Sequence, residues 1–178
     1  MKKMSYVKLS IITAVSIALC VVLPMAFHSI PNAGSIILPM HIPVLLCGLI
    51  CGPFFGLLAG LAGPLLSNLF TGMPPAAFLP QMMIELAVYG LICGLMMKMI
   101  RTKKVFVDLY ISLIVSIIIG RVVAGIAKAL IFAPGNFTMA VWTTSYFVTG
   151  WPGIVIQLVL IPAVVFALMK AKLIPERY

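Results

Sequence analysis

Charge is the property in which this sequence is poorest. Asp, Glu, Lys and Arg together make up 8% of its 178 residues, and only three residues are acidic, whereas about a quarter of an ordinary soluble domain is charged. Hydrophobic residues make up 63%, and the mean hydropathy is +1.25. A water-soluble fold of this size could not cover its surface with so few charges. The composition therefore excludes a soluble domain and indicates that lipid is the solvent.

Motifs for catalysis and metal binding are also missing. The sequence contains no HExxH, Walker A or GxSxG motif and no pair of acids at helical spacing, which argues against the common hydrolases and nucleotide-binding enzymes. No cysteine belongs to a CxxC pair or has a histidine at ligand spacing, and all lie within apolar runs, where we expect small packing residues. The cysteines are Cys20, Cys47, Cys51 and Cys93. We therefore expect no enzyme activity, no catalytic residue, no metal and no cofactor.

Long apolar segments, each of roughly 15 to 25 residues, are what the sequence has in abundance, and they predict about six transmembrane helices. The predicted spans are 8–27, two within 38–70 that divide near Gly52–Pro53, 78–97, 107–132 and 152–169. We expect an all-α integral membrane bundle that forms one membrane domain over 1–178, with helices 1–4 in about 8–100 and helices 5–6 in about 107–170. A cleavable signal sequence is a minor alternative for the first span, because lysines precede it.

The net charge of +9 follows the topology of a membrane protein rather than the pattern of a nucleic-acid-binding protein. Basic residues gather at the ends of the apolar segments, whereas the predicted loops 28–37, 71–77 and 133–150 contain no Lys or Arg. By the positive-inside rule, this distribution predicts an even number of spans with both the N and the C terminus in the cytoplasm. The basic groups are Lys2, Lys3 and Lys8, then Lys98, Arg101, Lys103 and Lys104, and finally Lys170, Lys172 and Arg177.

Three charged residues fall in the interior of the predicted spans, away from the residues at which a span begins, and such residues are functional candidates because charge is costly in a bilayer. They are Glu85, Arg121 and Lys128. The two cations are seven residues apart, so they share a helix face and lie about 10 Å apart along the axis. We expect Glu85 at a depth that allows an ion pair with either cation, which leaves the other to attract an anionic ligand. A Glu85 side chain that faces the substrate is the remaining alternative.

Uncharged side chains near the predicted outer ends of the spans are further candidates for substrate contacts. Gln157 could offer an amide at a similar depth, and Asn68 and His41 lie close to the predicted outer loops. A helix–helix hydrogen bond explains Gln157 equally well, whereas residues placed like His41 and Asn68 are more often solvated or capping residues than ligand contacts. Trp142 and Trp151 belong to an aromatic segment that is typical of an interfacial belt, although one of them could instead line a site.

Three segments resemble the substrate-binding S component of an energy-coupling factor (ECF) vitamin transporter. Ala14 and Ala18 match the AxxxA pattern with which these subunits dock their transmembrane coupling subunit. The stretch formed by 42–48 and 52–60 resembles the second-to-third helix segment of the family, and 85–90 resembles part of its fourth helix. The resemblance covers nearly the whole chain, including its size, its predicted spans and its lack of an ATPase motif.

The resemblance implies a multi-pass subunit of the bacterial plasma membrane that captures a small water-soluble vitamin or precursor with high affinity. Its partners would be a transmembrane coupling subunit and two cytoplasmic ATPase subunits, which would supply the energy for uptake. The surplus cation makes pantothenate the first candidate substrate, with folate, pyridoxine-type vitamins and hydroxymethylpyrimidine as the others. A small membrane enzyme or scaffold without a transport role is the alternative interpretation.

Overall fold

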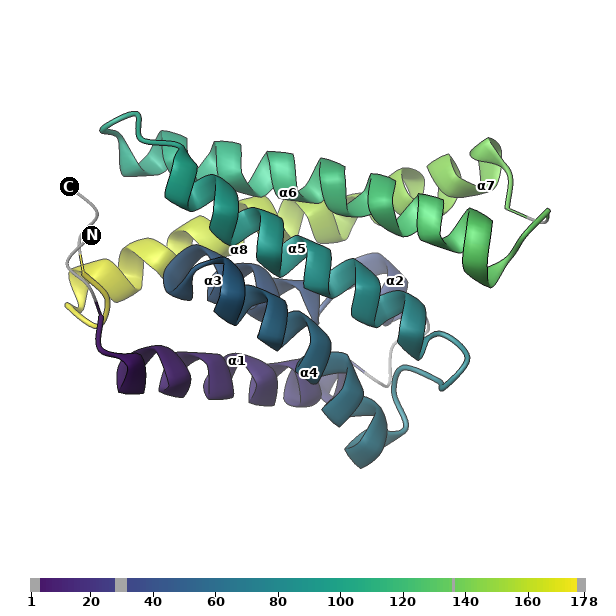
Figure 1. The fold of residues 1–178 in the computed structure, drawn as a ribbon, viewed down its shortest axis with the longest axis horizontal. Helices are drawn as coiled ribbons and strands as arrows, with labels where there is room; N and C mark the ends of the chain where they lie inside the picture. The colour runs from purple at the N-terminus through teal and green to yellow at the C-terminus, as the bar shows by residue number, and fades with distance from the viewer. Residues whose placement is uncertain (1–3, 28–31, 136, 176–178) are drawn as a thin grey trace.

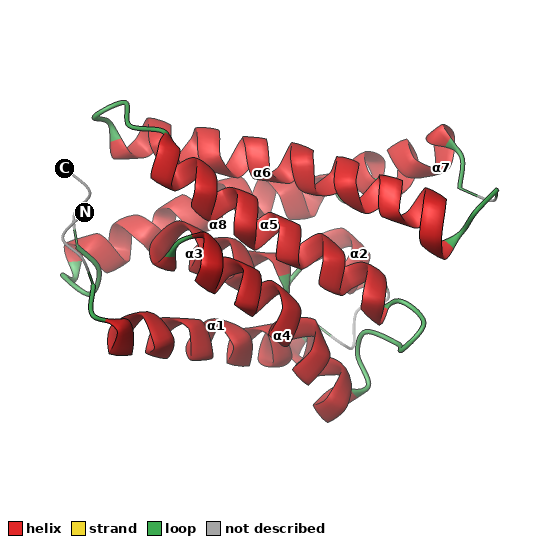
Figure 2. Ribbon diagram, in the orientation of Figure 1, coloured by secondary structure: helices red, strands yellow, loops and turns green. Residues whose placement is uncertain are grey.

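The computed structural model describes residues 4–27, 32–135 and 137–175 and consists of helices joined by short connections, with no strand in these ranges (Figure 2). The helices are α1 (Tyr6–Ala26), α2 (Ala33–Ile37), α3 (His41–Cys51), α4 (Pro53–Thr71), α5 (Leu79–Met99), α6 (Val105–Ala127), η1 (Lys128–Phe132), α7 (Met139–Thr143), η2 (Thr144–Val148) and α8 (Trp151–Lys170). The segments η1 and η2 are π-helical turns that continue α6 and α7. The predicted all-α fold is confirmed.

Within the described residues, six helical segments are long and apolar enough to cross a membrane, which confirms the predicted number of spans. They are Tyr6–Ala26, Gly34–Cys51, Pro53–Thr71, Leu79–Met99, Val105–Phe132 and Trp151–Lys170. The second span is interrupted, because α2 ends at Ile37, Leu38 has a φ of 54° and α3 begins at His41. The predicted loop 133–150 also differs from expectation, since α7 and η2 make much of it helical.

The predicted tight turn at Gly52–Pro53 separates α3 from α4. Gly52 has a φ of 93° and closes α3 while it opens α4, and glycine adopts this backbone conformation without a steric penalty. Pro53 follows in the first turn of α4, where its missing N–H has no helical partner to bind. The Gly52 N–H donates to the Gly48 carbonyl at 3.0 Å, so the end of α3 stays hydrogen-bonded through the turn.

Glycines bring α4 and α5 into direct backbone contact. A Cβ atom added to Gly56 would collide with the backbone of Gly90, and one added to Gly90 would collide with Gly56. Gly94 meets the backbone of Pro53 in the same way. Such small-residue contacts let helices associate in lipid, where no hydrophobic force drives them together.

Helix α5 occupies the middle of the bundle and packs against α3, α4 and α6 (Figure 1). Helix α8 contacts α2, α3 and α6, while α1 lies at one edge against α3 and α4. Much of α1 faces outward, as the exposed side chains of Ile11, Val15 and Val22 show. The interior of the bundle is therefore formed mainly where α3, α5, α6 and α8 meet.

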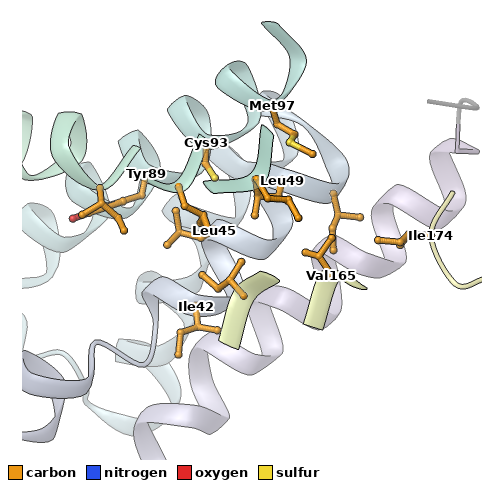
Figure 3. Close-up of a cluster of buried hydrophobic side chains, with 13 residues drawn as sticks. Ile42, Leu45, Leu49, Tyr89, Cys93, Met97, Val165 and Ile174 are labelled. Atoms are coloured by element: carbon orange, nitrogen blue, oxygen red, sulfur yellow. The ribbon is translucent and has the colours of Figure 1, made fainter. Parts of the chain in front are cut away.

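The main apolar cluster extends from this interior to the end of the bundle that carries the chain ends (Figure 3). A cavity of about 30 Å³ lies at that end, and both Met4 and Ile174 line it. The first and last described segments therefore lie together, as an even number of spans requires. Tyr89 marks the opposite limit of the cluster, and Figure 3 shows its hydroxyl pointing away from the other members. We call the end of the bundle opposite the chain ends the distal end.

Candidate substrate-binding site

A layer of buried polar side chains lies directly beyond the apolar core, toward the distal end. This polar layer consists of His41 on α3, Glu85 on α5, Arg121 on α6 and Gln157 on α8. Each lies four residues, or about one helical turn, from a core residue of its own helix; these core residues are Leu45, Tyr89, Ile117 and Ile161, respectively. The four polar residues are at most 8% exposed. Four helices therefore contribute one buried polar residue each at the same level of the bundle.

Glu85 is paired with His41. The Nε2 atom of His41 lies 3.3 Å from Oε1 of Glu85. The expected ion pair with Arg121 or Lys128 is therefore wrong, because α3 rather than α6 supplies the partner of the carboxylate at this depth. The imidazole meets the Tyr89 ring edge-on with 4.9 Å between the centroids. Its Nδ1 atom is buried without a hydrogen-bond partner.

Arg121 is 2% exposed and has no carboxylate partner among the described residues. Its guanidinium carbon lies 5.8 Å from the ring centroid of Tyr146 and 5.5 Å from that of Phe147, and aromatic faces at such distances attract a cation. Its Nε atom has no hydrogen-bond partner. A Cβ atom added to Gly150 would come within 3.2 and 3.3 Å of the two terminal guanidinium nitrogens. The charge therefore lies against the backbone at the start of α8.

Gln157 and Tyr89 add further unused hydrogen-bonding groups. Gln157 is 1% exposed, and neither its Oε1 nor its Nε2 has a partner. The Tyr89 hydroxyl is likewise buried without a partner. Tyr89 is close enough to Glu85 and Arg121 to interact electrostatically with both, so it connects the two charged parts of the polar layer. Because buried polar groups nearly always have partners, these side chains are candidate ligand contacts.

The segment 139–148, formed by α7 and η2, covers Arg121 on the side away from the core. The Trp142 Nε1–H donates to the backbone carbonyl of Arg121 at 3.1 Å. A Cβ atom added to Gly125 would collide with the Trp142 indole. This glycine therefore accommodates Trp142. Of the two tryptophans predicted as candidates, Trp142 is the one that contacts a residue of the polar layer.

Tyr146 ties this cover to α5. Its hydroxyl accepts a hydrogen bond from Nε2 of Gln81 at 3.0 Å. Burial, and to a smaller extent the charge of Glu85, raise the pKa of the Tyr146 phenol, so it remains a neutral hydrogen-bonding group at physiological pH. Both η1 and η2 adjoin this region, and π-helical turns are frequent at functional sites.

Three further predicted contact residues lie outside the polar layer. The Lys128 Nζ atom lies 5.1 Å from the ring centroid of Phe137, in the turn that follows α6. Trp151 is 60% exposed at the start of α8, as an interfacial belt requires. Asn68 Nδ2 donates to the Pro74 carbonyl at 2.7 Å and so ties the end of α4 to the loop that follows it. These positions favour structural roles for all three.

The predicted docking residues Ala14 and Ala18 are both exposed on α1. Thr13 and Ser16 of the same helix are buried, and their hydroxyls donate to carbonyls one turn earlier at 2.8 and 2.9 Å. Helix α1 therefore turns its hydroxyl side chains toward the bundle and its AxxxA face outward. That face is accessible to another protein in the bilayer.

Four residues of interest escape a reading of the sequence alone. They are Tyr89, Tyr146, Gln81 and Asp108. Asp108 is fully buried in the first turn of α6 and accepts hydrogen bonds from the Thr102 N–H at 2.9 Å and the Thr102 hydroxyl at 2.7 Å. It belongs to the turn between α5 and α6, at the end opposite the polar layer. The four-residue spacing from Glu85 is the signal that could have identified Tyr89.

A family model described as the ECF transporter, substrate-specific component, matches residues 5–174, a range that contains all six spans and the polar layer. The chain belongs to this family. No match to a curated protein or to a solved structure accompanies it. Members of the family are S components, the substrate-binding membrane subunits of a transporter. This S component therefore takes a small-molecule substrate and associates with transmembrane and ATPase modules.

Proposed function

We propose that this S component captures a small, anionic, water-soluble vitamin or vitamin precursor with high affinity at the outer face of the bacterial plasma membrane. A transmembrane coupling subunit and two cytoplasmic ATPases energise its uptake. The S component itself catalyses no reaction. The polar layer forms the floor of the substrate site, and the segment 139–148 covers it.

The proposal rests mainly on the buried charge of Arg121. Its charge is 2% exposed and has no carboxylate partner in the part of the chain that is described. An isolated buried cation is strongly unfavourable unless an anion and hydrogen bonds compensate it. A substrate carboxylate would supply both. In an S component, this makes the buried guanidinium a natural anchor for an anionic substrate.

The distribution of positive charge supports an outward-facing polar layer. Lys98, Arg101, Lys170 and Lys172 are exposed at the end of the bundle that carries the chain ends, and the positive-inside rule assigns such groups to the cytoplasm. With both termini in the cytoplasm, the distal end faces outward. The remaining members of the predicted terminal groups, Lys2, Lys3 and Arg177, lie outside the described residues.

Pantothenate is our first candidate because its carboxylate suits Arg121. Folate is also anionic, and pyridoxine-type vitamins and hydroxymethylpyrimidine complete the set to be tested. Docking to the coupling subunit is assigned to Ala14 and Ala18, whose small side chains on an exposed face allow close approach of a partner helix.

Reconstituted transport is the test. The S component, its coupling subunit and the two ATPases are purified together and placed in proteoliposomes, and accumulation of radiolabelled pantothenate is measured with and without ATP. We expect accumulation that requires ATP and ceases with catalytically inactive ATPases. A chain that never assembles with the coupling module would contradict the proposal and favour a membrane enzyme or scaffold.

A further inference from the structure

The polar layer carries more free hydrogen-bonding capacity than a packing interface needs. Five buried atoms at this level lack a hydrogen-bond partner. They are His41 Nδ1, Tyr89 Oη, Arg121 Nε, Gln157 Oε1 and Gln157 Nε2. Within the described ranges, Ser67 Oγ on α4 is the one other side-chain atom in this condition. Since buried polar atoms are nearly always paired, their concentration here indicates groups that complement a ligand.

The two sides of the layer offer different chemistry. On α6, the Arg121 guanidinium forms charge-assisted hydrogen bonds with a carboxylate or a phosphate. On α8, the Gln157 amide offers both a donor and an acceptor. Its complement is a ligand group that also offers both, such as an amide or a hydroxyl. Arg121 and Gln157 together therefore suit a ligand that carries both an anion and a neutral hydrogen-bonding group.

The α3–α5 side disfavours a second anion. The Glu85 carboxylate is paired with His41, whose Nε2 lies 3.3 Å from Oε1, and the other ring nitrogen of His41, Nδ1, is buried without a hydrogen-bond partner. The Tyr89 ring contacts His41 edge-on, and its hydroxyl, which can donate and accept, is close enough to Glu85 and Arg121 to interact electrostatically with both. A ligand hydroxyl matches these groups, whereas a negative group would be repelled by Glu85.

We infer, on the basis of the proposed function, that the substrate is a monocarboxylate whose uncharged remainder carries amide and hydroxyl groups. Its carboxylate lies against Arg121, its amide meets Gln157, and its hydroxyl end faces His41 and Tyr89. Pantothenate has this composition. A phosphate could bind a guanidinium equally well. The test must therefore distinguish a carboxylate from a phosphate, and it must show at which end of the ligand the anion is bound.

The experiment measures dissociation constants for three probes on the full-length S component in lipid nanodiscs. Pantothenate is compared with panthenol, in which a hydroxymethyl group replaces the carboxylate. The third probe is the derivative of pantothenate that is phosphorylated on its terminal hydroxyl. On the unmodified protein, we expect panthenol to bind at least about tenfold more weakly than pantothenate. We expect no measurable binding of the phosphorylated derivative, because its phosphate would face Glu85.

Variants assign each part of the ligand to its side chain. Arg121→Gln should abolish the difference between pantothenate and panthenol, because only the carboxylate interacts with the guanidinium. Gln157→Leu should weaken both ligands by the same factor. Lys128→Gln is the matched control, since it removes a cation that packs against Phe137, and it should change neither affinity.

Panthenol binding as tight as pantothenate would overturn the inference, and so would tighter binding of the phosphorylated derivative. An Arg121→Gln variant that weakens both ligands equally would show a structural role for the guanidinium and would also overturn it. The comparison of ligands on the unmodified protein remains decisive if a variant does not fold. An S component that assembles with its coupling subunit but does not bind pantothenate would refute this substrate class and leave the proposed function standing. Binding of pantothenate without assembly with the coupling subunit would support this substrate class and contradict the proposed function.

Discussion

Replacing Gln157 by leucine tests whether the polar layer lowers the stability of the ligand-free protein. The amide is 1% exposed and both of its polar atoms lack partners, and leaving a buried polar group unpaired costs about 1–3 kcal/mol. Leucine has a similar size and removes both atoms. We therefore expect Gln157→Leu to raise the free energy of unfolding by about 2 kcal/mol. For a chain of this length, that corresponds to an increase in Tm of about 4–8 °C.

Gln81→Leu is the matched control. Its amide donates to the Tyr146 hydroxyl at 3.0 Å, so this substitution removes a formed hydrogen bond and should lower the stability by about 1 kcal/mol. Thermal unfolding of both purified variants in detergent, without ligand, is followed by tryptophan fluorescence and far-ultraviolet circular dichroism. The two substitutions should shift Tm in opposite directions.

The direction in which Gln157→Leu shifts Tm decides whether the Gln157 amide is unpaired in the ligand-free protein. A decrease in Tm comparable to that of Gln81→Leu would mean that the Gln157 amide is hydrogen-bonded within the chain. The reasoning from unpartnered atoms would then fail. An increase in Tm together with weaker substrate binding would show that this residue serves the ligand at a cost in stability.

Two other perturbations address packing and partner docking. Gly90→Ala should destabilise the bundle by about 3 kcal/mol, because its Cβ would collide with the backbone of Gly56. Gly34→Ala, whose Cβ would meet nothing within 4 Å, is the control in the same thermal assay, and equal effects would contradict the backbone contact. Replacing Ala14 and Ala18 together by leucine should abolish uptake in proteoliposomes and leave the affinity for substrate unchanged. Loss of substrate binding instead would refute the docking role of that face.

The sequence was sufficient to predict the spans and most of the polar layer, because both depend on contrast with an apolar background. A long apolar run must become a helix in lipid, where every backbone group has to be paired internally. A polar side chain such as Arg121 or Gln157 then stands out at a depth that can be counted from the end of its span. Glu85 was identified as a candidate in the same way, whereas His41 was a candidate because it lies close to a predicted outer loop.

The pairing within the layer could not be predicted, because it depends on which helices are neighbours and how each is rotated. Glu85 meets His41 across 44 positions of the sequence. This contact requires the interruption around Leu38, after which His41 becomes the first residue of α3. Hydropathy carries no information on that break.

The roles of the tryptophans depended on local structure in the same manner. Trp142 and Trp151 are the same type of residue and lie close together in the sequence. The π-helical turn η2 and the short helix α7 fold Trp142 back onto Gly125 and Arg121, whereas Trp151 opens α8 and is 60% exposed. The segment 133–150, which was predicted as a loop, therefore forms the helical turns that give the two tryptophans different environments.

The apolar core below the polar layer has a consequence for how substrate can cross the membrane. Leu45, Ile117 and Ile161 pack together one turn below the layer, and the cavity near the chain ends has a volume of about 30 Å³, far below the roughly 300–1,000 Å³ of a ligand pocket. A substrate bound at the proposed site would therefore rest on packed apolar side chains. Under the proposed function, a substrate that leaves the layer toward the cytoplasm would have to pass these packed apolar side chains. For the proposed transport, the energy supplied by the partner subunits would therefore have to move this apolar barrier.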